Sequence, residues 1–264
     1  MSKAGEILNN SRKIVLKIGS NVLSAAEGGI DLRVVADIVG QVDALRKRGK
    51  QVIIVSSGAE ISGVSAINLR SRHGDINYKQ AMCAIGQVEL MMAYKKYFTE
   101  HDTVVGQLLL TQDNFSDSNS RLHIRNTLFT LIDEGVVPII NENDSVSIEE
   151  MTFGDNDALA ALTANLWNAN LLILLSDIDG LYDKPPKDYE NAVLIREVGD
   201  IEELMGRVDV SGKSSFGTGG MVSKINAAKT VREFGTALLL ANGKQQNVLT
   251  DIADGKEYGT IFPG

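Results

Sequence analysis

A glycine-rich turn followed by a lysine lies towards the carboxyl end of the chain, from Gly217 to Met221 and at Lys224. Glycines let backbone N–H groups approach a ligand closely, because they carry no Cβ atom. The pattern predicts a helix from Gly219 to about Glu233. The first turn of a helix has N–H donors without helical partners and a partial positive charge, which attract phosphate. The segment therefore indicates a nucleotide phosphate site, although an ordinary glycine-rich surface loop has the same composition.

Two common phosphate motifs do not fit the sequence. The segment from Gly206 to Ser214 imitates a P-loop, but it has one residue too many between its glycines. In the turn itself, Val222 stands where a dinucleotide fingerprint has its third glycine. The chain is therefore predicted to be neither a P-loop NTPase nor a Rossmann dehydrogenase.

Composition narrows the function classes further. The chain has 264 residues, 26 basic and 34 acidic side chains and a net charge of −8, which argues against nucleic acid or an anionic membrane as the main partner. Cys83 is the single cysteine, so we expect no intrachain disulfide and a reducing compartment. The polar start and short apolar runs predict a soluble, cytoplasmic protein. His73, His101 and His123 lack metal-ligand spacing, so we expect no metal held by them.

Predicted strands and helices alternate along the chain, and these elements must position the candidate residues. Continuous apolar runs suit buried parallel strands, and amphipathic segments between them suit covering helices. Strands are predicted at Ile14–Ile18, Val52–Val55, Val104–Leu110, Val136–Ile140, Leu171–Leu175 and Ala237–Leu240. Helices are predicted at Leu32–Arg48, Tyr78–Phe98, Arg121–Asp133 and Ala158–Asn168. The alternation predicts an α/β fold, a three-layer αβα sandwich with a mainly parallel central sheet.

Polar segments directly follow four of the predicted strands. They are Gly19–Asn21, Ser56–Ala59, Asn141–Asp144 and Ser176–Gly180. Ligands of open α/β sheets lie at the carboxyl ends of the strands, so we expect these segments to converge on one site.

Lys17 and two acid–amide segments are the sharpest candidates for chemistry. Lysine is rarely buried without a partner, so Lys17 either reaches solvent from a sheet edge or serves a site. The segments Asn141–Asp144 and Gly154–Asp157 supply acceptors for an ammonium group and donors for a carboxylate, as an α-amino acid pocket requires. Asn156 or Asp157 could instead cap the following helix, and Ser56–Ala59 could be a plain turn with a serine cap.

Taken in order, the motifs resemble the amino acid kinase family, and within it the glutamate 5-kinases. The matching segments are Val15–Ser20, Val55–Ala59, Ala84–Gln87, Ile139–Asp144, Gly154–Asp157, Ser176–Tyr182 and Gly217–Met221. The resemblance implies a single kinase domain over residues 1–264, with a glutamate-binding lobe at 1–170 and an ATP-binding lobe at 171–264. It also implies a form without the C-terminal PUA module of many members. Asp183 to Pro186 departs from the Thr-Ala-Asp-Pro that members often carry, which affects only the expected loop near the nucleotide.

The resemblance also assigns residues to roles. Glutamate would be bound by Ser57, Asn141, Asp144, Asp155 and Asn156. ATP would be bound by Lys17, Ser176, Asp177, Thr218, Gly219, Gly220, Met221, Val222, Ser223 and Lys224. Lys17 and Lys224 would stabilise the transferring phosphoryl group, with Asp157 orienting them. Mg²⁺ would bridge the β- and γ-phosphates, with no protein ligand assigned.

The activity implied is ATP-dependent phosphorylation of the side-chain carboxylate of L-glutamate to L-glutamyl 5-phosphate, the first step of proline biosynthesis. The resemblance further implies inhibition by proline, transfer of the product to glutamyl phosphate reductase, and a homo-oligomer. Kinases for N-acetylglutamate, aspartate, carbamate or UMP are alternatives within the fold, and the acid–amide segments favour an acceptor with a free amino group. A non-catalytic nucleotide or amino acid sensor is the alternative from another class, against which the retained lysines argue.

Overall fold

The computed structural model describes residues 1–67, 75–147, 156–184, 186, 188–207 and 220–264. Of the sequence candidates, His73, Asp155, Thr218 and Gly219 lie outside these residues.

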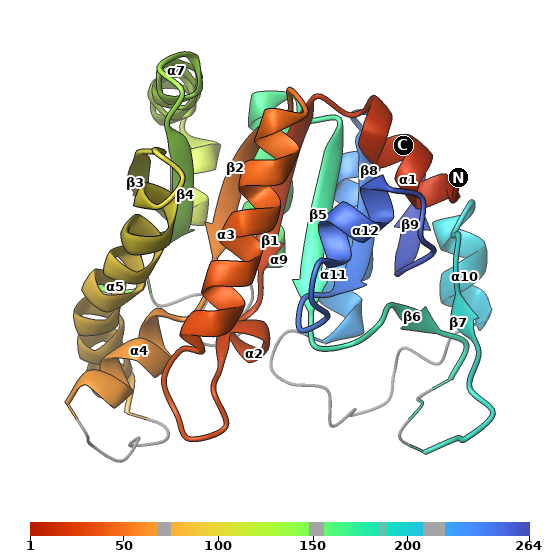
Figure 1. The fold of residues 1–264 in the computed structure, drawn as a ribbon, viewed down its shortest axis with the longest axis horizontal. Helices are drawn as coiled ribbons and strands as arrows, with labels where there is room; N and C mark the ends of the chain where they lie inside the picture. Colours follow the sequence, from red (N-terminus) through yellow and green to blue (C-terminus); the bar gives the residue numbers. More distant parts are fainter. Residues whose placement is uncertain (68–74, 148–155, 185, 187, 208–219) are drawn as a thin grey trace.

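Within the described residues, one seven-stranded sheet forms the middle layer, in the order β3-β4-β2-β1-β5-β8-β9 (Figure 1). Its strands are β1 (Lys13–Ile18), β2 (Gln51–Ser56), β3 (Val105–Leu110), β4 (Val137–Glu142), β5 (Leu171–Ser176), β8 (Ala237–Asn242) and β9 (Thr260–Phe262). All neighbours pair in parallel except β9, which runs antiparallel to β8. A separate antiparallel pair joins β6 (Leu181–Tyr182) to β7 (Leu194–Ile195).

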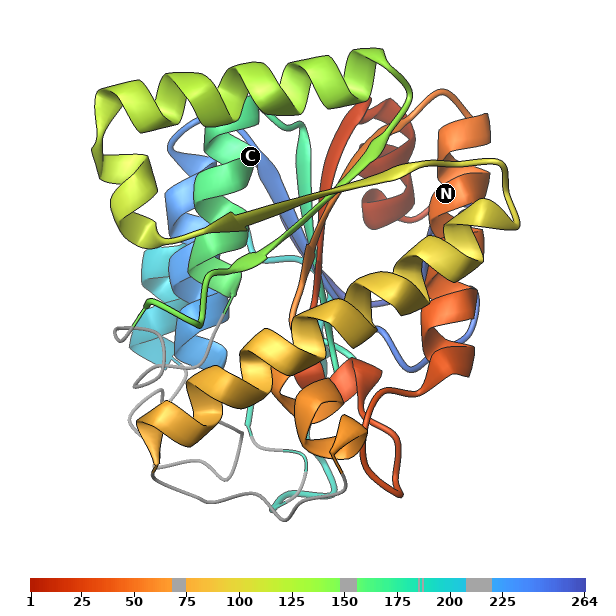
Figure 2. The ribbon, with the colours of Figure 1, turned by 90° about the vertical axis from the view of Figure 1, so that its left-hand side faces the viewer.

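Helices cover both faces of the sheet and enclose two apolar cores, which confirms the predicted αβα sandwich (Figures 1 and 2). One core is covered by α1 (Lys3–Asn10), α2 (Ser20–Leu23), α3 (Leu32–Lys47), α5 (Ile76–Thr99) and α12 (Val248–Ala253), with α4 (Ala59–Ala66) packed on α5. The other is covered by α6 (Gln112–Ser116), α7 (Ser118–Asp133), α9 (Asp157–Trp167), α10 (Ile201–Arg207) and α11 (Met221–Arg232). No described helix combines the length and apolar character that crossing a membrane requires.

The two-residue period of β1 decides which face receives Lys17. Ile14, Leu16 and Ile18 point into the core under α3 and α5, while Val15 points into the core under α9 and α11. Lys17 lies two residues after Val15, so it points to the same face as Val15. That face is the one on which α9 and α11 lie. Lys17 is therefore buried at the middle of the sheet, and the alternative of a sheet-edge lysine is wrong.

The N-termini of the helices near the sheet edge are not capped by the side chains that the sequence suggested. The N-cap of α4 is Gly58, in the left-handed region at φ 105°, so the serine cap is wrong. Asn156 occupies the N-cap position of α9, but its side chain makes no capping hydrogen bond. Gly220 is the N-cap of α11, which begins at Met221. The Ser57 and Asn156 side chains are therefore available for other contacts.

Candidate active site

The polar segments gather at the edge of the sheet where the parallel strands end, the lower edge in Figure 1. Ser57 N donates to Ile18 O over 3.0 Å, which joins the turn after β2 to the end of β1. Asn21 Nδ2 donates to Asp177 Oδ2 over 3.1 Å, which joins the turns after β1 and β5. The expected convergence is confirmed for these segments.

A buried carboxylate between two lysines forms the centre of the site. Lys17 Nζ lies 2.6 Å from Asp157 Oδ1, and Lys224 Nζ lies 3.1 Å from Asp157 Oδ2. Ser223 Oγ donates to the same Oδ2 over 2.9 Å. Asp157 is fully buried, and the two lysines are 5% and 8% exposed. Side chains from β1, α9 and α11 thus meet at one point.

The charges at this centre suit an anionic ligand. Two ammonium groups face one carboxylate, so the three side chains together are positive. Asp157 is the first residue of α9, where the helix dipole stabilises a negative charge. Met221, Val222 and Ser223 form the first turn of α11, whose N–H groups attract anions. The arrangement can accept the phosphates of a nucleotide.

Gly19 keeps space open beside Lys17. A Cβ atom on this glycine would lie 3.8 Å from Lys17 Nζ and 3.4 Å from the carbonyl oxygen of Leu175. The absent side chain therefore leaves room for a ligand at the ammonium group.

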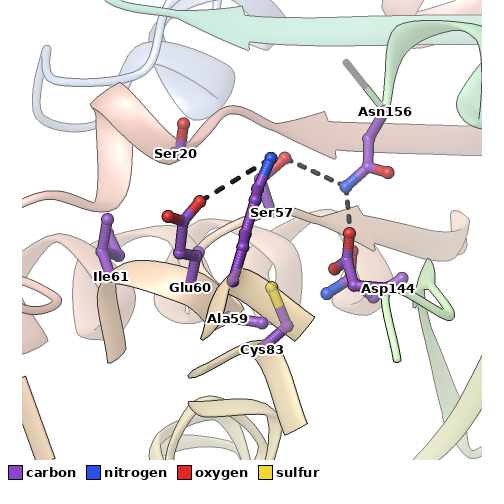
Figure 3. Close-up of a pocket in the computed structure, with 11 residues that line it drawn as sticks. Ser20, Ser57, Ala59, Glu60, Ile61, Cys83, Asp144 and Asn156 are labelled. Atoms are coloured by element: carbon purple, nitrogen blue, oxygen red, sulfur yellow. Dashed lines mark hydrogen bonds and ion pairs between the residues drawn. The ribbon is translucent and has the colours of Figure 1, made fainter. Parts of the chain in front are cut away.

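A cavity of about 130 Å³ adjoins this centre on the side of β2 and β4 (Figure 3). Its lining residues are Ser20, Ser57, Gly58, Ala59, Glu60, Ile61, Lys79, Cys83, Asn141, Asp144 and Asn156. Asn156 Nδ2 donates to Asn141 Oδ1 over 2.9 Å and to Ser57 Oγ over 3.0 Å. Four residues expected to bind an amino acid (Ser57, Asn141, Asp144 and Asn156) therefore line one cavity, and the fifth, Asp155, lies outside the described residues.

Residues behind the cavity fix its polar wall. Asn141 Nδ2 donates to Gln87 Oε1 over 2.8 Å, and Ser56 Oγ lies 2.8 Å from Tyr94 Oη. Both partners come from α5, which spans the back of the cavity. Gln87 ends one of the segments that carry the family resemblance, although the sequence alone gave it no role.

Burial controls the acidity of two groups in the cavity. Burial raises the pKa of the Asp144 carboxyl, while the charge of Lys79 and a hydrogen bond from Cys83 lower it. Burial also raises the pKa of the Cys83 thiol, and the nearby carboxylates Asp144 and Glu60 raise it further. The thiol is therefore protonated and acts as a donor to Asp144.

The nucleotide candidates Ser176 and Asp177 lie at the carboxyl end of β5, the strand that pairs with β1 on the side away from β2. Ser176 Oγ donates to Asp177 Oδ1 over 3.3 Å. Asp179 accepts from Asn242 Nδ2 over 2.8 Å, which ties the turn after β5 to the end of β8. A second cavity, of about 430 Å³, opens beside this turn, and its lining includes Tyr182, Arg196 and Tyr258. The volume of this cavity and the tyrosine rings that line it suit a nucleoside.

The αβα sandwich is shared with solved structures of small-molecule kinases. UMP kinase from Ureaplasma parvum superposes with a TM-score of 0.66 at 18% identity, over 97% of this chain and 100% of the other. Isopentenyl phosphate kinase from T. acidophilum superposes with a TM-score of 0.60 at 17% identity, over 95% and 99%. At these identities the likeness shows the shared fold alone.

The chain belongs to the amino acid kinase family, whose sequence profile matches residues 12–242. Glutamate 5-kinase from Alkaliphilus metalliredigens is 55% identical over 97% of both chains. Glutamate 5-kinase from Alkaliphilus oremlandii is 52% identical over 97% of this chain and 98% of the relative. Glutamate 5-kinase from Thermoanaerobacter sp. is 43% identical over 95% of this chain and 67% of the relative.

Proposed function

We propose that the chain transfers the γ-phosphoryl group of ATP to the side-chain carboxylate of L-glutamate, giving L-glutamyl 5-phosphate and ADP, as the first step of proline biosynthesis. One observation carries the proposal: an amino-acid-sized polar cavity adjoins a buried lysine pair through the consecutive residues Asn156 and Asp157. The relatives named glutamate 5-kinase, at 55% and 52% identity over nearly the whole chain, support the choice of acceptor.

The cavity is proposed as the glutamate site. Asp144 supplies a carboxylate for the α-ammonium group. Asn156 Oδ1 is buried with no hydrogen-bond partner among the described residues, so it can accept from the same ammonium. Ser57 and Asn141 complete the polar wall, and Asp155 is proposed as a further contact from its place in the Gly154–Asp157 motif. A free α-amino group matches these acceptors, whereas an N-acetyl group would leave them unpaired.

The nucleotide is proposed to bind on the side of residues 171–264, and the amino acid on the side of residues 1–170. Ser176 and Asp177 would contact the nucleotide after β5, and Thr218 to Lys224 would hold the phosphates at the start of α11. The described residues contain no group of three or more His, Cys, Asp or Glu placed to hold a metal ion. In the proposed reaction, phosphate oxygens and water would hold Mg²⁺, which would neutralise phosphate charge when bound.

The chemistry requires positioning and charge rather than a base. The acceptor carboxylate is ionised at neutral pH, so one of its oxygens forms the new bond to phosphorus directly. The bond between the γ-phosphorus and its bridging oxygen breaks, and ADP leaves with the electron pair. Lys17 and Lys224 flank this transfer and stabilise the phosphoryl oxygens, and Asp157 holds both ammonium groups in place.

Trapping the product tests the proposal. Glutamyl phosphate is an acyl phosphate, so added hydroxylamine converts it to a hydroxamate that is measured by colour. We expect hydroxamate formation to require glutamate, ATP and Mg²⁺ together. Coupled ADP detection with N-acetylglutamate, aspartate, carbamate and UMP provides the comparison. Faster turnover of any of these than of glutamate would refute the proposed acceptor, and no turnover of any would favour a sensor.

Proline, a reductase and a second copy of the chain are proposed as partners. Proline carries the same α-carboxylate and a secondary ammonium, so it can occupy the amino acid end of the cavity and inhibit competitively with glutamate. The acyl phosphate is labile, so a reductase that consumes it is expected to follow. Inhibition kinetics, co-purification with glutamyl phosphate reductase and sedimentation velocity test the three partners separately.

A further inference from the structure

We infer that Lys79 binds the α-carboxylate of the amino acid, and that Glu60 and Asp144 share its α-ammonium group. The inference rests on the proposed function. It adds a residue that determines the orientation of the bound amino acid. No pattern in the sequence predicts a role for Lys79 or for Glu60.

Lys79 is the one cation among the described residues that line the cavity. Lys17 and Lys224 lie outside this lining; both contact Asp157, the residue after Asn156, at the proposed phosphoryl site. Glutamate brings two carboxylates into a cavity that already holds Glu60 and Asp144. An α-carboxylate there needs a positive charge of its own, and Lys79 is placed to supply it.

The ion pair between Lys79 and Glu60 is loose enough to admit a zwitterion. Their charged atoms lie 3.9 Å apart, beyond hydrogen-bond distance, and the side chains are 30% and 40% exposed. A bound amino acid can place its carboxylate on Lys79 and its ammonium between Glu60 and Asp144. Each charge would then gain a partner and none would be left buried alone.

Asp144 is within the electrostatic reach of Lys79. The Lys79 charge lowers the pKa of the Asp144 carboxyl and of the Cys83 thiol, against the effect of burial. One ammonium therefore acts on the acidic wall of the cavity, and the α-carbon end of the substrate fits at this place.

Two helices hold this group of charges at a fixed spacing. Glu60 lies in the first turn of α4, and Lys79 lies near the start of α5. The helices touch through glycines: a Cβ on Gly86 would come within 1.7 Å of the Ala59 carbonyl oxygen, and one on Gly63 within 1.9 Å of that of Met82. Such close backbone contact fixes the position of Glu60 relative to α5.

The consequence is a choice between the two carboxylates of glutamate. If the α-carboxylate is held at Lys79, the side-chain carboxylate extends past Ser57 and Asn156 towards the lysine pair. A reversed substrate would present its α-carboxylate to the phosphate. Lys79 therefore selects the 5-position through its own contact with the α-carboxylate.

The test replaces the charge and measures each substrate separately. For Lys79→Gln we expect KM for glutamate to rise on the order of ten- to a hundredfold, with KM for ATP within about twofold and kcat reduced less than kcat/KM. Lys79→Arg should recover most of the affinity. Lys95→Gln, an exposed lysine on the same helix, is the matched control and should behave as wild type.

A second substrate distinguishes binding from a structural effect. Isoglutamine carries a neutral α-amide in place of the α-carboxylate. The wild type should prefer glutamate to isoglutamine, and Lys79→Gln should lower that ratio of kcat/KM at least about tenfold. An unchanged ratio, or an unchanged KM for glutamate, would overturn the inference. Should Lys79→Gln not fold, Lys79→Met, which also removes the charge and keeps most of the side-chain volume, provides the same ratio. Absence of glutamate kinase activity in the wild type would instead refute the proposed function.

Discussion

Two consecutive residues, Asn156 and Asp157, contact different parts of the candidate site. Asn156 directs its amide to Asn141 and Ser57 at the cavity, and Asp157 directs its carboxylate to the two lysines. The chain passes from the N-cap to the first turn of α9 at this step, so the two side chains leave in different directions. A shift of α9 would move acceptor and phosphoryl contacts together. In the proposed reaction, this turn of the backbone would set the distance between the two substrates.

Removing either lysine should affect turnover more than folding. Lys17→Met and Lys224→Met keep the volume of the side chain and remove its charge. Each leaves Asp157 with the other lysine, so the carboxylate is not left without a cation. Loss of a contact that stabilises the transferring charge should reduce kcat about a hundredfold, which corresponds to about 3 kcal/mol. Steady-state kinetics and urea unfolding measure the two effects.

Other lysines on the same elements provide the controls. Lys13→Met on β1 removes a cation that lies over Phe129 and Trp167, and Lys229→Met on α11 removes a partner of Glu202. Neither residue contacts Asp157 in the structure, so both variants should keep kcat within about twofold. Near-normal turnover in Lys17→Met and Lys224→Met would refute the role of the lysine pair.

The pH dependence of glutamate binding should follow Asp144. Burial raises the pKa of this carboxyl above its ordinary value of 3.8, so it takes up a proton at a higher pH than an exposed aspartate. A protonated Asp144 cannot hold the α-ammonium, so KM for glutamate should rise by up to about tenfold per pH unit below that pKa. Asp144→Asn should have a high KM with a flatter pH profile. An equal slope in both enzymes would contradict the assignment.

The same shift makes a prediction for stability with a definite sign. The folded pKa of Asp144 lies above the unfolded one, so the folded protein binds this proton more tightly. The group contributes most at low pH, and its contribution is lost as the pH rises from the ordinary aspartate value through the raised one. In urea titrations, the free energy of unfolding of Asp144→Asn should therefore rise relative to that of the wild type as the pH increases from the ordinary aspartate pKa of 3.8 through the raised pKa of Asp144.

At the scale of elements, the contact between α4 and α5 determines the shape of the cavity. Gly86→Ala would place a methyl group against the backbone of α4, within 1.7 Å of the Ala59 carbonyl oxygen and 2.3 Å of the Gly63 nitrogen. Backbone cannot give way as a side chain can, so α4 must move. We expect a loss of about 2 to 3 kcal/mol in stability and a several-fold rise in KM for glutamate, with KM for ATP little changed.

Gly40→Ala is the control for this substitution. Gly40 also lies inside a helix, α3, but a Cβ built on it meets nothing within 4 Å. Alanine has the better helix propensity, so this variant should be as stable as the wild type or slightly more so. If Gly86→Ala behaved like Gly40→Ala in thermal unfolding and kinetics, the close glycine contact would not be what positions α4.

At the scale of the whole molecule, the sequence predicts the sheet well because the strands are short apolar runs with clear ends. The apolar run from Ile14 to Ile18 predicted β1, and the single lysine within it, Lys17, indicated the candidate active site. The sequence did not predict β9, whose three residues are too few to show a period. Lys79 and Glu60 lie in different helices, and their pairing depends on how α4 packs on α5, which no local pattern encodes. The expected serine cap of α4 was wrong, and Asn156 is the N-cap of α9 without a side-chain capping bond, because its amide donates to Ser57 and Asn141 instead.

The continuous sheet predicts that the two expected lobes, residues 1–170 and 171–264, unfold together. β1 and β5 pair over five residues between the lobes, and each apolar core contains residues from both sides of position 170. Neither lobe can lose its structure without exposing the core of the other, so equilibrium unfolding should be a single transition. Trp167, the one tryptophan, is fully buried at the end of α9, just before β5. Its fluorescence should therefore change at the same urea concentration as the far-ultraviolet circular dichroism. Separate midpoints for the two signals, or a stable fragment ending near residue 170 after proteolysis, would show that the lobes are independent folding units.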